Sequence, residues 1–305
     1  MIRIFDYTVD AAESGETIQT FLEKRGYSHP VLVHLKKTTE GIKRNGRWDY
    51  LRTTLAAGDA LCITLREDSS SDIVPMELPL SICYEDDDIL VVNKPADMPV
   101  HPSLGNETPS LANAVCGYYK ALGIPYTFRC VNRLDKDTSG LVILAKHMLS
   151  AAILNSAIAR RDIRREYLAL VYGHPGTSGT IDAPIRRASC DGILREVHPG
   201  GQRAVTHYRV LLAAGDYTLI SLHLETGRTH QIRVHMTHIG HPLLGDSLYG
   251  TSDDTFNRCT QIKRQALHSY RLQFTHPITG ESMDFTAPLP VDMAALLPER
   301  LDAFL

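Results

Sequence analysis

One acidic residue is set apart by its neighbours. Asp135 lies in the loop Arg133–Gly140, directly before the apolar run Leu141–Ala145. A short run of branched apolar residues that follows a glycine predicts a buried strand, which puts Asp135 at the mouth of that strand. A carboxylate there could act as a nucleophile or base at a sugar carbon, where cleavage of a glycosidic bond builds positive charge. The alternative is a turn aspartate that hydrogen-bonds its own backbone.

Two further segments carry polar side chains next to predicted strands. Alternation predicts a strand that follows Arg164 and contains Tyr167, preceded by a helix over Ser150–Arg161. A second strand runs to Leu224, and helical spacing then predicts a helix that stops at Gly240. The elements that must position the chemistry are therefore strands and the turns that follow them. A tyrosine that leads a strand is most often a packing residue, so Tyr167 has no assigned role from spacing alone.

These segments resemble the RluA-type pseudouridine synthases, over most of residues 78 to 290. The loop around Asp135 resembles one family signature, with Asp135 at the place of the single essential aspartate, and Thr226–His235 resembles a second. The resemblance implies an α+β fold with a mixed, mainly antiparallel central sheet and flanking helices. It implies that Arg233 pairs with Asp135, and that Arg133 fills the space left by a flipped nucleotide. The catalytic residues it implies are Asp135, Tyr167 and Arg233, and the substrate-binding residues are Arg133, Thr138, Arg228 and His230.

The function that the resemblance implies is isomerisation of uridines in structured RNA, ribosomal or transfer, to pseudouridine. A stacked uridine must be flipped out of its helix to reach such a pocket. Asp135 either attacks the anomeric carbon or helps to remove a sugar proton, and the sequence leaves both routes open. A glycoside hydrolase would need a second carboxylate, for which Asp137 is poorly placed. A catalytically silent RNA-binding or ribosome-assembly protein is the stronger alternative.

Four histidines of the last predicted helix and its flanks suggest a zinc site. Histidines three apart on a helix can share a face, as His235 and His238 do, with His230 and His241 nearby. The sequence lacks H-E-x-x-H, so we expect no metal site. A phosphate loop, a dinucleotide fingerprint and a G-x-S-x-G nucleophile are also missing, and we expect no cofactor.

The chain divides into two predicted domains. Residues 15–66 resemble, weakly, an S4 RNA-binding module, and the acidic stretch Glu67–Asp72 is typical of a linker. We therefore assign residues 1–72 to an S4-like module with its linker and residues 73–305 to the catalytic domain. The three consecutive aspartates Asp86–Asp88 are expected to form a solvated turn, because neighbouring side chains rarely converge on one ion.

Composition narrows the class of protein further. The net charge of the 305 residues is -3, yet residues 160–233 hold eleven arginines, no lysine and seven acidic residues, which favours phosphate recognition by that part of the chain. The six cysteines are scattered, which indicates free thiols. No apolar run is long enough to span a bilayer, and the first residues lack the order of a signal peptide. We expect a cytoplasmic monomer with RNA as its partner.

Overall fold

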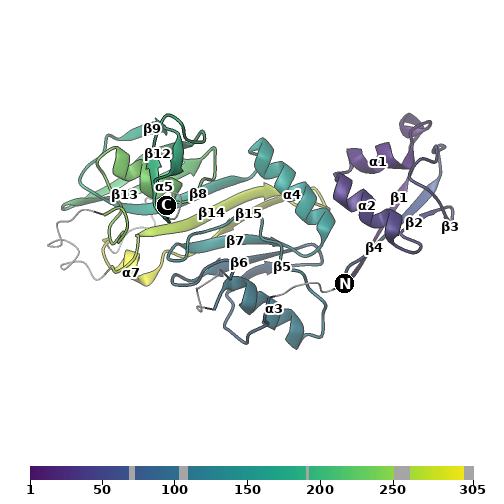
Figure 1. The fold of residues 1–305 in the computed structure, drawn as a ribbon, viewed down its shortest axis with the longest axis horizontal. Helices are drawn as coiled ribbons and strands as arrows, with labels where there is room; N and C mark the ends of the chain where they lie inside the picture. Colours follow the sequence, from purple (N-terminus) through teal and green to yellow (C-terminus); the bar gives the residue numbers. More distant parts are fainter. Residues whose placement is uncertain (69–72, 103–108, 190–191, 251–261, 299–305) are drawn as a thin grey trace.

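The computed structural model describes residues 1–68, 73–102, 109–189, 192–250 and 262–298. The first part is a four-stranded antiparallel sheet of order β1-β4-β2-β3 with two helices on it (Figure 1). Its elements are β1 (Ile2–Thr8), η1 (Ala11–Glu13), α1 (Ile18–Lys24), α2 (His29–Lys37), β2 (Ile42–Arg44), β3 (Arg47–Trp48) and β4 (Ala60–Arg66). The turn between β2 and β3 has positive φ at Asn45 and Gly46, as an Asn-Gly hairpin requires.

A nine-stranded sheet of order β5-β6-β7-β14-β8-β13-β12-β9 forms the second part, with β15 also paired to β14. Every pairing is antiparallel except that of β7 with β14. The predicted α+β class with a mixed, mainly antiparallel sheet is therefore confirmed. The strands are β5 (Ile82–Glu85), β6 (Ile89–Lys94), β7 (Ser139–Ala145), β8 (Arg164–Tyr172), β9 (Ser178–Asp182), β12 (Val205–Ala214), β13 (Tyr217–Leu224), β14 (Leu267–Thr275) and β15 (Ser282–Thr286).

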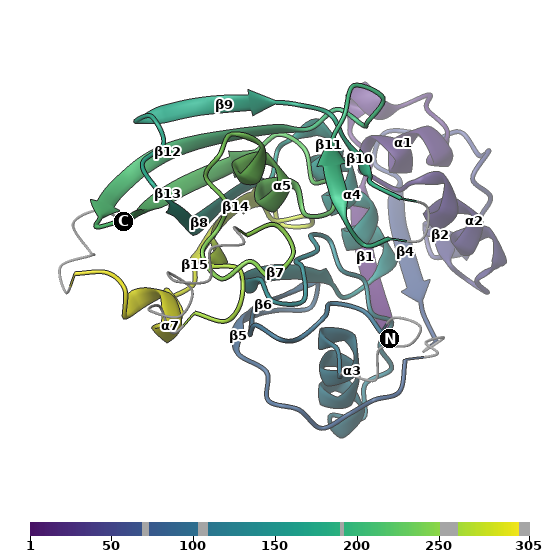
Figure 2. The ribbon, with the colours of Figure 1, turned by 60° about the vertical axis from the view of Figure 1, so that its left-hand side comes forward.

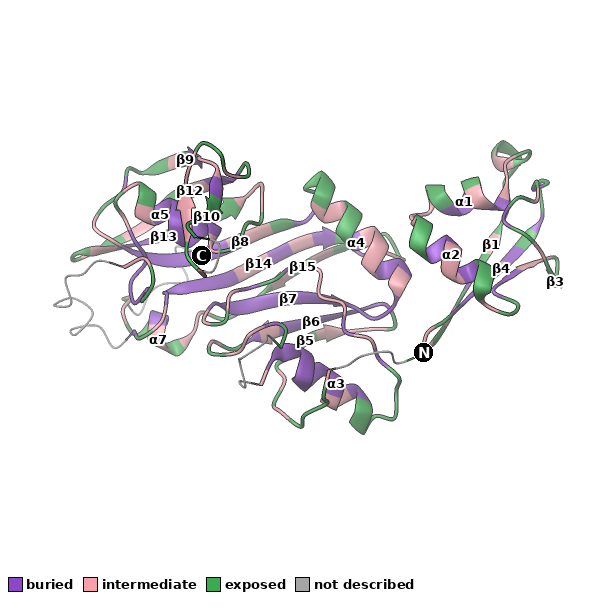
Figure 3. Ribbon diagram, in the orientation of Figure 1, coloured by how far each residue is buried: buried purple, intermediate pink, exposed green. Residues whose placement is uncertain are grey.

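Helices cover both faces of this sheet at β6 and β7. The apolar runs of these two strands, Ile89–Val92 and Leu141–Ala145, point side chains to both faces, and both faces must therefore be covered. Leu141 and Ile143 of β7 pack with α4 (Met148–Arg160), whereas Val142 and Leu144 pack with α3 (Leu111–Ala121). Figure 3 shows β6 and β7 buried along their length. The described part also contains α5 (Gln231–His238), α7 (Val291–Ala294) and a separate hairpin of β10 (Ile185–Arg187) with β11 (Arg195–Val197).

Gly140 allows β7 to start where it does. Its φ is +112°, and a Cβ there would lie 2.3 Å from the carbonyl oxygen of Ser269 on the parallel strand β14. A side chain at this position would clash with backbone, so only glycine permits the close approach. The loop that carries Asp135 is thereby held against the middle of the sheet.

The turn Asp86–Asp88 between β5 and β6 corrects a prediction. Asp88 is buried rather than solvated, and Arg3 of β1 donates to both of its carboxylate oxygens at 2.8 and 3.1 Å. His147 also bonds Asp88 at 2.9 Å. Burial opposes the charged form, but the hydrogen bonds from His147 and Arg3 outweigh it and hold the pKa of Asp88 at about 2. The turn is a polar junction between the two sheets.

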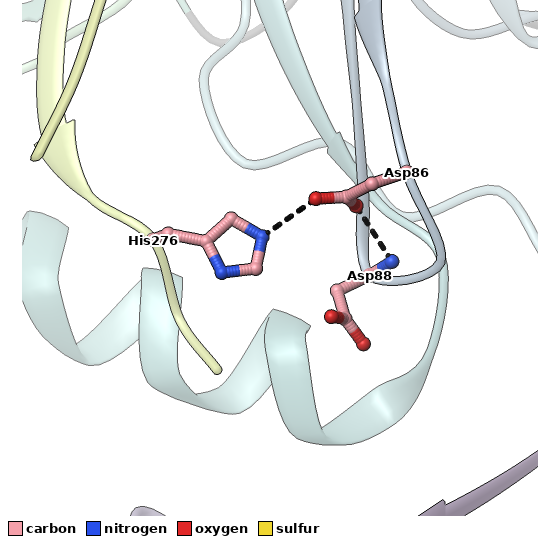
Figure 4. A group of neighbouring side chains, drawn as sticks. All are labelled: Asp86, Asp88 and His276. Carbon is pink, nitrogen blue, oxygen red and sulfur yellow. Dashed lines mark hydrogen bonds and ion pairs between the residues drawn. The ribbon is translucent and has the colours of Figure 1, made fainter. Parts of the chain in front are cut away.

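Asp86 faces His276, just past β14, in the same junction (Figure 4). Asp86, Asp88 and His276 lie close enough for their ligand atoms to share an ion. Each acid already has protein partners, however: Asp86 accepts the N–H groups of Asp88 and Ile89, and Asp88 holds the Arg3 guanidinium. A bound cation would have to displace that guanidinium. We therefore interpret these contacts as structural, since they join the first sheet to the second.

Glu67 also departs from its prediction as part of a solvated linker. Its side chain is 9% exposed, accepts the backbone N–H of Met148 at 2.6 Å and pairs with Arg129. Asp68 is exposed, as predicted, and residues 69–72 of that predicted linker lie outside the described residues. Among the described residues, no helix combines the length and the apolar character needed to cross a membrane.

Candidate active site

All seven residues singled out from the sequence line one cavity of about 680 Å³. The loop before β7 supplies one wall, β8 a second, and the turn after β13 with the start of α5 a third. The chain thus brings together three segments that are far apart in the sequence. The residues are Arg133, Asp135, Thr138, Tyr167, Arg228, His230 and Arg233.

Asp135 meets the guanidinium of Arg233 across this cavity. The distance from Arg233 Nη1 to Asp135 Oδ2 is 3.4 Å. The Asp135 side chain is 24% exposed and that of Arg233 only 5%, so the acid can reach a substrate while its counter-ion stays covered. The pairing expected from the sequence is present, at the long end of hydrogen-bonding distance.

Arg233 has a stronger partner that sequence reasoning missed. Asp246 accepts from Arg233 Nε at 2.7 Å and from Nη2 at 2.8 Å, a bidentate pair, and its side chain is fully buried. Burial lowers the pKa of Arg233, but the bond to Asp246 and the charge of Asp135 outweigh it and leave that pKa raised. Arg233 is therefore a fixed cation. The segment around Asp246 matched the family, but the sequence offered no sign of its partner.

Tyr167 of β8 is buried in the wall beside Asp135. Burial raises the pKa of its phenol; the charge of Arg165 opposes this shift and that of Asp135 adds to it. The hydroxyl is consequently neutral at physiological pH and able to donate a proton. Arg165 lines the same cavity, and its Nε is buried without a partner among the described residues.

His230 adopts a left-handed backbone, with φ of 56°, at the start of α5. Its Nδ1 lies 2.8 Å from the hydroxyl of Tyr249, which also accepts the N–H of Arg195 at 2.8 Å. Burial lowers the pKa of His230 and so favours its neutral imidazole.

The other expected substrate-binding residues occupy different positions in the cavity. Arg133 and Arg228 are exposed at its rim. Thr138 is buried, its N–H donates to the carbonyl of Asp135 at 3.1 Å, and its hydroxyl accepts from Gln265 at 3.3 Å. Thr138 thereby shapes the loop that carries the carboxylate.

Lys94 at the end of β6 contacts the backbone of the loop that carries Asp135. Its ammonium is buried and donates to the carbonyls of Pro95, Met98 and Lys136 at 2.8, 2.7 and 3.0 Å. Burial lowers the pKa of Lys94 to about 7. The available sequence signal was a lysine that comes two residues after the apolar run Ile89–Val92, within the same strand.

The histidines that suggested zinc point to separate partners. His235 bonds the Thr206 hydroxyl and the Ala183 carbonyl, both at 2.9 Å, and His241 bonds the carbonyl of Tyr172. With His230 on Tyr249, these three rings do not converge. Their contacts favour structural roles.

Comparison with known proteins identifies the family. Residues 88–238 match the family model described as RNA pseudouridylate synthase. The chain is 42% identical over 283 residues to the uncharacterized RNA pseudouridine synthase YjbO of Bacillus subtilis (strain 168), covering 92% of this chain and 98% of the relative. It is 43% identical over 254 residues to ribosomal large subunit pseudouridine synthase D of Pasteurella multocida (strain Pm70), covering 81% and 78%. The solved structure of human RNA pseudouridylate synthase domain containing 1 has a TM-score of 0.59 at 29% identity, covering 75% of this chain and 95% of that one. The chain belongs to the family of RluA-type RNA pseudouridine synthases.

Proposed function

We propose that this enzyme isomerises a uridine of ribosomal RNA to pseudouridine, with the carboxylate of Asp135 as its catalytic group. The observation that carries the proposal is a partly exposed carboxylate in a cavity of about 680 Å³, paired with a buried guanidinium. Several relatives are named ribosomal large subunit pseudouridine synthases, which favours ribosomal over transfer RNA. We further propose that it acts in the cytoplasm as a monomer, with no metal or cofactor.

The proposed reaction breaks the bond between uracil N1 and the anomeric carbon and forms a bond from C5 to the same carbon. C5 then loses its proton and the freed N1 gains one, so the product is an isomer of uridine and the atoms balance without an external reactant. In this proposal Asp135 either attacks the anomeric carbon or helps to remove a sugar proton, and both routes use its carboxylate. Arg233 places a positive charge beside this carboxylate.

The test of the proposal is a map of pseudouridines in total RNA from cells with and without this protein. Loss of a site in large-subunit ribosomal RNA would support it, and restoration by the wild-type gene but not by an Asp135→Asn gene would assign the chemistry. Loss of a site in transfer RNA would instead identify transfer RNA as the substrate. An unchanged map with altered ribosome assembly would favour a silent RNA-binding protein.

Tyr167→Phe tests proton transfer at the same site. Because the phenol is neutral and adjoins Asp135, we expect the single-turnover rate to fall by about 10² to 10⁴ if the hydroxyl moves a proton. A ring that only stacks on the base would leave the rate within a few-fold of wild type. Single-turnover assays at saturating enzyme distinguish the two roles, with thermal melting as the control for folding.

Arg133→Ala tests nucleotide flipping. Arg133 is exposed at the rim, two residues from Asp135, where it can replace an extruded base. We expect a much larger loss of rate on a structured RNA than on a short single strand, since the single strand has little stacking to break. Equal losses on the two substrates would contradict a flipping role and indicate a simple phosphate contact.

We propose that residues 1–72 form an S4-like RNA-binding module and that residues 73–305 form the catalytic domain. Exposed Lys36 and Lys37 at the end of α2 and exposed Arg47 on β3 support an RNA-facing surface. The contacts of Arg3 with Asp88 and of Glu67 with Met148 support a fixed placement of the module on the catalytic domain.

A further inference from the structure

A second cavity adjoins the catalytic one on the side of the β10–β11 hairpin, which lies beside α5 (Figure 2). Its volume is about 390 Å³. Arg133, Gly227, Arg228 and Thr229 line both cavities, so the two are continuous. A polymer that places one unit in the catalytic cavity can extend its next units into the second.

Among the described residues, the second cavity is lined by five arginines and by no acidic residue, and we call it the arginine groove. We propose that the arginine groove binds the phosphodiester groups of the RNA strand next to the target uridine. This inference rests on the proposed function and adds the part of the substrate that lies outside the catalytic cavity. Guanidinium groups match phosphate oxygens in a planar, bidentate geometry. The arginines are Arg133, Arg186, Arg187, Arg195 and Arg228.

The pairing of the hairpin supports an anionic ligand. Arg186 lies opposite Glu196, and their side chains pair at 2.8 Å. Arg187, in contrast, lies directly opposite Arg195. The hairpin thus places two cations together at the lining of the groove.

The hairpin is fixed relative to the catalytic cavity. The N–H of Arg195 donates to the hydroxyl of Tyr249, which bonds His230 in the catalytic cavity. On the other side, Ile185 and Gln202 exchange two backbone hydrogen bonds at 2.9 and 2.8 Å. The close packing needs a glycine at position 201, because a Cβ on Gly201 would lie 2.5 Å from the backbone of Ile185. Phosphates in the groove would therefore be held at a set distance from Asp135.

The test measures binding of the full-length protein to a fluorescein-labelled oligouridylate of about twelve nucleotides over a series of salt concentrations. Arg187→Gln and Arg195→Gln are the groove variants. Arg209→Gln is the matched control, because Arg209 is exposed on β12 and lines neither cavity. Each lost phosphate contact on a single strand lowers the slope of log affinity against log salt by about 0.7. We expect that loss for each groove variant, with binding weakened several-fold at low salt, and a wild-type slope for Arg209→Gln.

A methylphosphonate-linked oligothymidylate of the same length, which has no backbone charge, should bind wild type and groove variants alike. Unchanged slopes for both groove variants would overturn the proposal and leave the groove to another partner, such as an acidic protein segment. An equal fall for Arg209→Gln would also overturn it, since any basic surface would then suffice. The slopes do not depend on turnover, so they stand even if no pseudouridine is formed. If pseudouridine is formed but the slopes are unchanged, only the groove is refuted.

Discussion

Asp135→Asn is expected to abolish pseudouridine formation, lowering the single-turnover rate by about 10³-fold or more. Asparagine keeps the shape of the side chain and loses the anion that the reaction needs at the anomeric carbon. Nucleoside mass spectrometry of digested RNA measures the product. Affinity for RNA should change little, because the substitution removes no positive charge.

A matched control is available in the same loop. Asp137 lies two residues from Asp135 and does not line the catalytic cavity. Asp137→Asn should retain most of the activity, although it removes the same charge from nearly the same place. An active Asp135→Asn protein, or an inactive Asp137→Asn protein, would contradict the assignment of the carboxylate.

The same variant separates catalysis from folding. Asp135 is only one of two acids around Arg233, and the bidentate partner is Asp246. Arg233 therefore keeps a counter-ion in Asp135→Asn, and we expect the free energy of unfolding to stay within about 1 kcal/mol of wild type. Chemical denaturation measured alongside activity should show that Asp135→Asn loses activity and keeps its stability.

The sequence predicted the parts of this site that depend on local pattern. The apolar run after Gly140 indicated a buried strand, and its position put Asp135 at the strand mouth, as the structure has it. Helical spacing likewise located α4 and α5. The meeting of Asp135 with Arg233 came from family resemblance, since no local pattern links residues 98 positions apart.

What the sequence did not predict depends on partners that are distant along the chain. Asp88 looked like a solvated turn residue because its neighbours are acidic, but Arg3 and His147 enclose it. The partners of Lys94 could not be predicted, since all three acceptors are backbone carbonyls and carbonyls have no sequence signal. The role of Asp246 could not be predicted either, because it depends on the contact with Arg233, which only the folded structure shows.

Arg233→Ala is expected to reduce both stability and catalysis. It leaves Asp246 fully buried without its cation, and breaking such a pair typically costs about 3 to 5 kcal/mol of folding free energy. It also removes the positive charge next to Asp135. Chemical denaturation and single-turnover rates measure the two losses, and Arg233→Lys, which keeps the charge without the planar fork, should recover part of each.

The double variant Arg233→Met/Asp246→Leu separates the two effects. Replacing a buried ion pair by apolar side chains of similar size is often neutral or stabilising, so stability should return toward wild type. Activity should not return, because Asp135 still lacks its cation. Recovery of activity together with stability would mean that Arg233 acts only through the fold.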